Sequence, residues 1–447
     1  MSLNARELAL KALISLRRES AWSDKALNKI ISGSTPDAKD LALATRITNG
    51  VLQNRAFCDY YIRLYSSVPI SKIEPQILDI LRISFYQMVF LTKIPHSAAV
   101  NEGVKLAKKH SHPRAAAYAN AVLRKFAANA DNLPNIKADT DAEKLSVQFS
   151  HPLWLTDAFL QRLGYAEAEA LLNANNADDI PITAQINTLR YTAGEAKKLF
   201  AADGVNAETH SFLSDCLLLN GAGNIAEMNA FKKGAFYVQD AAAKLSVMVS
   251  GVREGDTVID CCAAPGGKSF AAAIAMKNQG KIIALDKYEN KLHLIKEGAS
   301  RLGIEIIEAF MRDSSQFHGE YAETANVVIA DVPCSGTGVI RKKPEIRYKP
   351  LEEIAGLPKI QKSILQNVSG YVKPGGALLY STCSLLKMEN EDVIAEFLNN
   401  NSDFTVEKPD LPKELNRNFS GSGTTLWPQR DDTDGFFICK LRRKNAN

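Results

Sequence analysis

Residues 330–338 read Ala-Asp-Val-Pro-Cys-Ser-Gly-Thr-Gly and follow an apolar run that begins at residue 325. Such a run predicts a buried strand that ends at Asp331. The proline two residues later stops the ladder of the strand, and the two glycines let the chain turn away. Because ligands of open α/β sheets bind at strand ends, Asp331 and Cys334 form a candidate reactive pair. The structural alternative is a capping aspartate beside a small buried cysteine.

Around this stretch, from Ala235 onward, strand patterns alternate with helix patterns. The alternation predicts an α/β domain over residues 235–443, built on a doubly wound parallel sheet. The expected strands are 257–261, 281–286, 305–309, 326–331, 376–381 and 436–441, and the expected helices are 268–277, 288–301, 352–371 and 389–399.

A loop of small residues follows the first of these strands and comprises Cys262, Ala263, Ala264, Pro265, Gly266, Gly267 and Lys268. Small side chains let the backbone approach a ligand, and the next helix offers free N–H groups. The segment Gly267-Lys268-Ser269 matches the second half of a phosphate-binding P-loop. That motif requires a glycine where Cys262 stands and has no proline inside it, so a nucleoside triphosphatase is disfavoured.

Aspartates end or follow the next three expected strands. Asp286 lies about 20 residues past the glycines, where an acidic residue receives ribose hydroxyls in nucleoside-binding sheets. Asp313 follows the third strand and could face an adenine amino group, and Asp331 ends the fourth. Each could be a plain cap or turn residue. Together they favour an adenosine-containing cofactor without phosphates.

A second cysteine, Cys383, follows the strand that ends at Ser381. We therefore expect Cys334 and Cys383 at adjacent strand ends of one cleft. A buried free cysteine is commonly an inert small hydrophobe. A nucleophilic thiol needs a depressed pKa, which oriented N–H groups and a nearby cation such as Lys268 can provide.

The first 130 residues show the apolar spacing of helices, which is seen over 37–52 and 75–91. A second helix is expected around Leu27–Ile31. They hold 19 Lys and Arg against nine Asp and Glu, a net charge of +10 in a chain whose total is +4. This asymmetry predicts a domain that meets a polyanion. Candidate RNA contacts cluster late in the domain, at Lys105, Lys108, Lys109, Arg114, Arg124 and Lys125. The alternative is a solvated helical surface.

A polar linker over 129–143 leads into a small α+β connector, residues 144–234. Its expected elements are a helix from His151 to about Leu172, strands at 183–187 and 217–219, and a helix at 194–202.

The composition limits the class of protein. The sequence is 46% hydrophobic and 23% charged, as in ordinary globular proteins, and no apolar run approaches the roughly 20 residues that span a bilayer. Its seven cysteines include no CxxC pair, so neither a metal site nor a disulfide framework is expected. We predict a monomeric cytoplasmic protein with free thiols, no membrane association and no metal.

The chain resembles the RNA cytosine-C5 methyltransferase family in three motifs: Asp260-x-Cys262-Ala-Ala-Pro-Gly-Gly-Lys268, Asp331-x-Pro-Cys334-Ser-Gly-Thr-Gly and Ser381-Thr-Cys383-Ser384. Residues 99–102 and 120–124 resemble an all-helical NusB-like RNA-binding domain, expected over residues 1–130. The pairing is similar to the bacterial small-subunit ribosomal RNA methyltransferases of the Sun/RsmB type, and the likeness covers nearly the whole chain. It implies a Rossmann-like methyltransferase domain, S-adenosylmethionine as cofactor and 16S ribosomal RNA as substrate.

Carbon 5 of cytosine is a poor nucleophile until a thiolate adds to carbon 6 and makes the ring an enamine. A carboxylic acid that contacts N3 favours this adduct, and Asp331 is the candidate. Chemistry alone does not say which cysteine attacks, and DNA cytosine methyltransferases carry their nucleophile at the position of Cys334. The resemblance implies that Cys383 attacks and that Cys334 assists product release. It also implies that the loop 262–268, Asp286, Asp313 and Asp331 hold the cofactor.

Four basic residues after the Pro-Cys loop, Arg341, Lys342, Lys343 and Arg347, are further candidate RNA contacts, with a solvated basic loop as the alternative. The target cytosine must leave its stack to reach a thiol. An N-methyltransferase is disfavoured, because the Asp331 motif lacks the aromatic residue that grips an exocyclic amine. A non-catalytic ribosome-assembly factor and C5 methylation of another RNA, such as transfer RNA, remain as alternatives.

Overall fold

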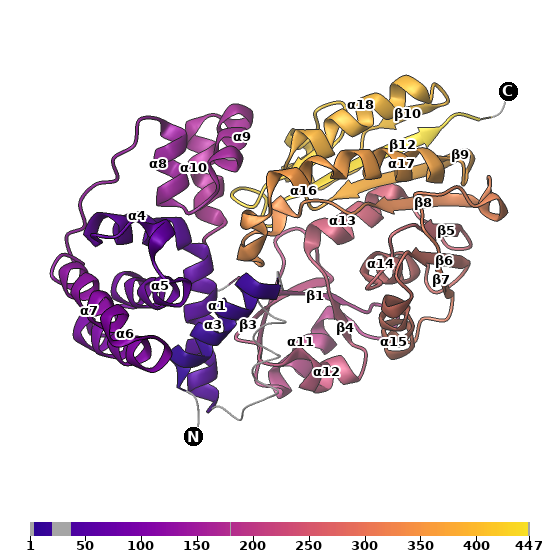
Figure 1. The fold of residues 1–447 in the computed structure, drawn as a ribbon. Helices are drawn as coiled ribbons and strands as arrows, with labels where there is room; N and C mark the ends of the chain where they lie inside the picture. Colours follow the sequence, from indigo (N-terminus) through magenta and orange to yellow (C-terminus); the bar gives the residue numbers. More distant parts are fainter. Residues whose placement is uncertain (1–3, 20–36, 179, 446–447) are drawn as a thin grey trace. The chain divides into compact units, whose positions relative to one another are not determined.

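The computed structural model describes residues 4–19, 37–178 and 180–445 (Figure 1). The chain divides into two compact units. The first comprises Met1–Asn176 together with Lys342–Tyr348, and the second comprises Ala177–Arg341 and Lys349–Asn447. Within the described residues, no helix has the length and apolarity needed to cross a membrane.

The first unit is helical, as the periodicity predicts. Its α-helices are α1 (Ala5–Glu19), α3 (Ala38–Gln53), α4 (Arg55–Tyr65), α5 (Pro75–Phe90), α6 (His96–His110), α7 (Pro113–Ala127), α8 (Asp141–Gln148), α9 (Leu153–Leu163) and α10 (Tyr165–Ala174). The helix expected around Leu27–Ile31 lies outside the described residues. Pro75 opens α5 at the first helical position, where a missing N–H costs nothing.

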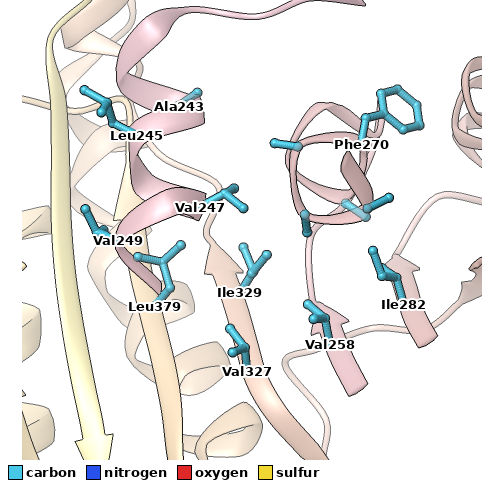
Figure 2. Packing of buried hydrophobic residues seen from close by; sticks show 14 of the residues in the cluster. Ala243, Leu245, Val247, Val249, Val258, Phe270, Ile282, Val327, Ile329 and Leu379 are labelled. Atoms are coloured by element: carbon cyan, nitrogen blue, oxygen red, sulfur yellow. The ribbon is translucent and has the colours of Figure 1, made fainter. Parts of the chain in front are cut away.

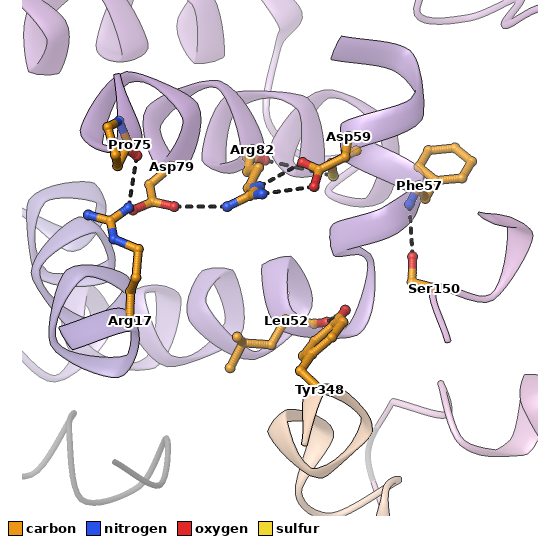
Figure 3. A network of polar contacts seen from close by, with 10 residues as sticks. Arg17, Leu52, Phe57, Asp59, Pro75, Asp79, Arg82, Ser150 and Tyr348 are labelled. Carbon is orange, nitrogen blue, oxygen red and sulfur yellow. Dashed lines mark hydrogen bonds and ion pairs between the residues drawn. The ribbon is translucent and has the colours of Figure 1, made fainter. Parts of the chain in front are cut away.

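The core of the helical unit combines stacked aromatics with paired charges. Phe85 of α5 stacks on Phe126 of α7, with ring centroids 3.6 Å apart. Arg82 donates to Asp59 of α4 through Nε, at 2.7 Å, and pairs with Asp79, which also accepts from Arg17 of α1 (Figure 3). The pairs join α1, α4 and α5 across buried surface, where each charge needs its partner.

The helix expected from residue 151 to 172 is interrupted. The structure has α9 and α10 instead, because Gly164 adopts φ +75° and ψ 171°, which ends α9. Only glycine adopts such a conformation without strain.

The second unit begins with an antiparallel sheet in the order β2-β3-β1-β4. Its elements are β1 (Ile182–Ile186), α11 (Ala193–Ala202), β2 (Asn206–Thr209), β3 (Cys216–Asn220), α12 (Asn229–Lys232) and β4 (Phe236–Val238). Helix α11 starts at a capping box in which Thr192 and Glu195 satisfy each other's backbone N–H groups. The α+β character predicted for the connector is confirmed for residues 177–234, whereas α8 to α10, which were expected in a connector that begins at residue 144, belong to the first unit.

The large sheet has the order β10-β12-β9-β8-β5-β6-β7, with β11 paired to β12. Its elements are α13 (Ala241–Ser250), β5 (Thr257–Asp260), α14 (Gly267–Ala275), β6 (Lys281–Asp286), α15 (Leu292–Leu302), β7 (Ile307–Met311), β8 (Ala325–Asp331), α16 (Leu351–Ala355), α17 (Leu357–Ser369), β9 (Val372–Thr382), α18 (Glu391–Asn400), β10 (Phe404–Glu407), β11 (Thr424–Leu426) and β12 (Phe436–Arg443). All six expected strands are present, and β10 and β11 are additional.

The sheet is mixed, which corrects the expectation of a wholly parallel one. Strands β5 to β9 pair in parallel, but β12 is antiparallel to both β9 and β10. Strands β9 and β10 therefore run in the same direction, and α18 supplies the crossover that parallel strands require. Strand β12 lies between them and runs the opposite way.

Each face of the sheet is buried by helices. Val327 and Ile329 of β8 join the cluster that contains Leu245 and Val247 of α13 (Figure 2). The alternate residues of β8 join a second cluster with Ile364 of α17 and other residues of α17 and α18. Because successive side chains of a strand point to opposite faces, both clusters are parts of one three-layer α/β domain.

The segment Lys342–Tyr348, expected to include RNA contacts, belongs to the helical unit. Arg347 is only 1% exposed, so it cannot contact RNA there. It donates to the carbonyl oxygens of Gln53, Phe149, Ser150 and Asn175 and to Oδ1 of Asn176. Burial lowers its pKa to about 10, which still leaves it charged at neutral pH.

Substituting Arg347 by Met should destabilise the helical unit by about 3–5 kcal/mol, because several buried acceptors lose their donor at once. Urea denaturation followed by circular dichroism measures this change. Arg114→Ala is the control, since Arg114 is an exposed arginine of the same unit, and it should change the free energy of unfolding by less than about 0.5 kcal/mol. If the two variants unfolded at the same urea concentration, the structural role of Arg347 would be contradicted.

Candidate active site

The glycine-containing loop joins β5 to α14. Gly266 has φ +113°, and a Cβ added there would lie 2.5 Å from the ring of Phe270, so only glycine fits. Beneath the loop, Ser269 donates to Oδ2 of Asp260 at 2.7 Å, whereas no residue that the structure describes donates to the buried Oδ1 with good hydrogen-bond geometry. Burial raises the pKa of Asp260 to about 7. The loop thus rests on a carboxyl group with spare capacity for a hydrogen bond.

The predicted aspartates lie at successive strand ends. Asp286, at the end of β6, accepts from the backbone N–H groups of Ala264 and Tyr288 at 3.1 and 3.0 Å. Asp313, after β7, pairs with Lys287 at 2.8 Å. Hydrogen bonds from Lys287 and from Ser315 lower the pKa of Asp313 to about 2. Backbone N–H groups therefore orient the side chain of Asp286, and Lys287 and Ser315 orient that of Asp313. The oxygens of both side chains can accept further hydrogen bonds.

At the end of β8, Asp331 is held by two donors. Lys268 Nζ lies 2.5 Å from Asp331 Oδ2, and the hydroxyl of Ser381 donates to Oδ1 at 2.8 Å. Lys268 is buried and also lies 5.1 Å from the ring centre of Phe436. Lys268 thus pairs with Asp331, the candidate N3 contact.

The two cysteines meet as expected. The sulfur atoms of Cys334 and Cys383 are 3.1 Å apart, and both side chains are partly exposed. The hydrogen bond between the two thiols lowers the pKa of Cys383 against the effect of burial, and the charge of Lys268 lowers it further. The same hydrogen bond, together with burial, raises the pKa of Cys334. The pair therefore favours a Cys383 thiolate beside a protonated Cys334, which matches the properties of a nucleophile and its assistant.

Sequence reasoning missed one polar group behind the cysteines. Glu389, only expected as the start of a helix, is 0% exposed and contacts the residues that follow both cysteines. An acidic residue before a helix is usually a surface residue of its first turn, so the sequence offers no local signal for its burial.

The hydrogen-bonding groups at the strand ends and in the loop 262–268 are suited to S-adenosylmethionine. The strand ends offer the carboxylates of Asp286, Asp313 and Asp331, which accept hydrogen bonds, and the loop offers backbone groups. The cofactor carries ribose hydroxyls, two amino groups and a positive sulfonium. A ligand with phosphates would meet repulsion from these carboxylates. Within the described residues, no group of His, Cys, Asp and Glu side chains could hold a metal ion.

A separate basic groove lies in the helical unit, between α6 and α7. It encloses about 740 Å³ and is lined by Asn101, Val104, Lys105, Lys108, Pro113, Ala116, Ala117, Asn120 and Arg124. Three of the six expected RNA contacts, Lys105, Lys108 and Arg124, line it. Lys109 instead pairs with Glu7 of α1 at 2.8 Å. The groove combines an apolar floor with cationic and amide groups, as nucleic-acid sites do.

Arg341, another expected RNA contact, pairs with Asp434 at 2.7 Å within the second unit. Its guanidinium is therefore engaged by protein.

Comparison with known proteins gives a consistent assignment. The family model described as 16S rRNA methyltransferase RsmB/F matches residues 247–442, the NusB family matches residues 3–128, and the ferredoxin-like domain of RsmF/B-like methyltransferases matches residues 151–226. The predicted NusB-like domain and the methyltransferase fold are thus confirmed.

Relatives match along the whole chain. The chain is 36% identical over 449 residues to a probable ribosomal RNA small subunit methyltransferase B of Bacillus subtilis, covering 99% of each. It is 31% identical to the protein of the same description from Synechocystis, covering 99% of this chain and all of the relative.

Two solved structures are also similar. The crystal structure of PH0851 has a TM-score of 0.82 at 27% identity and covers 99% of this chain and 100% of that one. A methyltransferase homologue from Pyrococcus horikoshii has a TM-score of 0.58 at 26% identity and covers 69% of this chain and 100% of that one. The chain therefore belongs to the RsmB/F family of 16S rRNA methyltransferases, which confirms the predicted class of S-adenosylmethionine-dependent rRNA methyltransferase.

Proposed function

We propose that the protein transfers a methyl group from S-adenosylmethionine to carbon 5 of a cytosine in small-subunit (16S) ribosomal RNA, through a covalent bond between Cys383 and carbon 6. The observation that carries the proposal is the 3.1 Å contact between the sulfurs of Cys334 and Cys383 beside the Lys268–Asp331 pair. A thiolate with a lowered pKa, a proton source for N3 and a second thiol are the groups that this chemistry needs.

The first step is attack by the Cys383 thiolate on carbon 6, which forms the S–C6 bond and moves the electrons of the C5–C6 double bond into the ring. Asp331 faces N3 and stabilises the added charge. Because Asp331 accepts from Lys268 at 2.5 Å, the proton that N3 receives comes from this pair rather than from an isolated carboxylic acid. The backbone of the loop 262–268 and the carboxylates of Asp286 and Asp313 hold the cofactor, which supplies an electrophilic methyl group.

After carbon 5 is methylated, its proton leaves and the S–C6 bond breaks, which restores the C5–C6 double bond and the Cys383 thiolate. Cys334 assists this step. The hydrogen bond to Cys383 is the main cause of the raised pKa of Cys334. Once Cys383 is bonded to carbon 6, its sulfur no longer shares the thiol–thiol hydrogen bond as a thiolate, and Cys334 gives its own proton to solvent. The Cys334 thiolate then takes the C5 proton, while N3 returns its proton to the Lys268–Asp331 pair.

Cys383→Ala should abolish methyl transfer to unmethylated 16S rRNA, because the C6 adduct cannot form. Cys334→Ala should form the adduct but release it slowly, so that a protein–RNA complex survives denaturing electrophoresis. Cys439→Ala, which removes a buried cysteine of the same unit, is the control and should retain transfer. A stable adduct with the Cys383 variant would reverse the two roles, and adduct-free transfer by it would refute the covalent mechanism.

We also propose that the groove between α6 and α7 binds single-stranded ribosomal RNA, with phosphates on Lys108 and Arg124 and riboses or bases on Val104 and Ala116. Lys105 also lines the groove, where it pairs with Glu102 at 2.8 Å. The local cationic surface and the net charge of +10 over residues 1–130 support this assignment.

The double variant Lys108→Ala/Arg124→Ala should raise the Kd for 16S rRNA by about tenfold and reduce the slope of log K against log salt by about one per lost phosphate contact. Filter binding over a series of salt concentrations measures both quantities. Lys72→Ala, an exposed lysine of the same unit outside the groove, should leave them unchanged. An unaltered salt slope in the double variant would show that the groove does not hold phosphates.

A further inference from the structure

Glu389 lies between the two cysteine loops as a fully buried carboxylate. Its Oε1 accepts from the backbone N–H of Ser335 at 2.9 Å and from Nε2 of Gln361 at 2.8 Å. Its Oε2 accepts from the hydroxyls of Ser335, at 2.5 Å, and of Ser384. None of these donors is a cation, and the described residues form no ion pair with Glu389.

These contacts hold the chain on both sides of Cys334. Ser335 follows the cysteine and donates to Glu389 through both its backbone and its side chain. Pro333 precedes it, and its carbonyl accepts from the same Gln361 amide at 3.0 Å. The two residues that flank Cys334 are thus tied, directly or through Gln361, to one carboxylate.

The loop of Cys383 is tied to the same group. Ser384 donates its hydroxyl hydrogen to Glu389 and accepts from the backbone N–H of Leu386 at 3.1 Å. The neighbouring Asn390 accepts from Thr382 at 2.6 Å and donates to the carbonyl of Ser384 at 2.8 Å. Residues on both sides of Cys383 are therefore fixed by the pair Glu389 and Asn390.

A carboxylate is suited to this task because it only accepts. It forces the hydroxyls of Ser335 and Ser384 to donate toward it, and hydrogen bonds to a charged group are stronger and shorter than neutral ones. Burying a carboxylate without a counter-cation is costly, so a group that serves only the fold would more simply be an amide or an apolar residue. The cost is compensated by full satisfaction of its acceptors.

We infer that Glu389 is a positioning residue that sets the distance between the sulfurs of Cys334 and Cys383 by holding both loops on one carboxylate. This inference rests on the proposed covalent mechanism. Glu389 does not touch the reacting atoms. It acts through Ser335, Ser384 and Gln361, and a misplacement of about 1 Å at such a site can cost on the order of 100-fold in rate.

Glu389→Gln tests the inference, since the amide keeps the size and removes the charge and one acceptor. We expect kcat for methyl transfer to 16S rRNA to fall by on the order of 100-fold, with KM for S-adenosylmethionine and RNA within about threefold of wild type. In a Cys334→Ala background, adduct formation should slow by a similar factor. Gln361→Met, a milder change in the same contacts, should lower kcat by about tenfold.

Thiol alkylation by iodoacetamide gives a readout that lost stability alone would not reproduce. Among the described residues, the charged groups around the Cys334–Cys383 pair include Asp331, Lys268 and Glu389, together with Lys349, which donates to the carbonyl of Ser335 at 2.8 Å. Removing the charge of Glu389 should move the alkylation profile of Cys383 to lower pH while methyl transfer becomes slower. Glu389→Asp restores the charge on a shorter side chain, so the profile should return toward wild type while kcat stays low.

Asp431→Asn is the matched control. Asp431 is a buried carboxylate of the same unit that accepts from the backbone of Trp427 and from Asn418 and also pairs with Arg417 at 3.1 Å, and its variant should keep kcat within about twofold. A wild-type kcat in Glu389→Gln, or an equal loss in Asp431→Asn, would overturn the inference. If neither Cys334→Ala nor Cys383→Ala formed an adduct although wild type transferred methyl groups, the covalent mechanism would fail, and kcat of Glu389→Gln would still decide the positioning role.

Discussion

The parallel pairing of β8 with β9 is the constraint on which the rest of the site depends. Asp331 lies opposite Ser381 in this register, and the two side chains are hydrogen bonded. Because parallel strands end at the same edge, the loops that carry Cys334 and Cys383 leave the sheet side by side. A slip of one residue would turn alternate side chains to the wrong face and separate Asp331 from Ser381. The thiol contact is thus a consequence of sheet register.

The antiparallel strand β12 closes the site from the other side of β9. Gly338, at the end of the Pro-Cys loop, donates to the carbonyl of Cys383 and accepts from Gly435, each at 2.8 Å. A Cβ at Gly338 would lie 1.9 Å from the carbonyl oxygen of Gly435. The second glycine of the Pro-Cys motif therefore permits a backbone contact that packs both cysteine loops against the start of β12. A parallel strand in this place would need a longer crossover connection.

Charge in the site is balanced over short distances. Lys268 neutralises Asp331 and stabilises a thiolate at Cys383, while Glu389 is compensated by dipoles alone. The charges of Asp331 and Glu389 raise the pKa of both thiols, whereas Lys268 lowers that of Cys383. The contact between the sulfurs adds to this difference, because it lowers the pKa of Cys383 and raises that of Cys334.

Much of the fold could be predicted from local patterns. The helices of the first unit and the strands β5 to β9 could be predicted from the spacing of apolar residues. A helix that buries one face has apolar residues at helical spacing, and a strand that is buried on both faces is a continuous apolar run. The meeting of Cys334 and Cys383 followed from the rule that strand ends share an edge. Arg347 shows the limit of such reasoning. A basic residue in a basic segment looks like a surface residue, and only the carbonyl groups of distant residues make its burial possible.

The sequence by itself therefore determined the helical character of the first unit, the strands β5 to β9 and β12, the loop of small residues, the aspartates at strand ends and the two cysteines. These features rest on local propensity and on the short-range rules of strands and turns. Only the tertiary structure decided that β12 runs antiparallel, that Lys268 turns to Asp331 and that Glu389 lies buried behind both thiols. Each of these three features depends on a contact between residues that are 28 or more positions apart in the chain, such as the one between Gln361 and Glu389. The pattern of neighbouring residues cannot predict a contact over that separation.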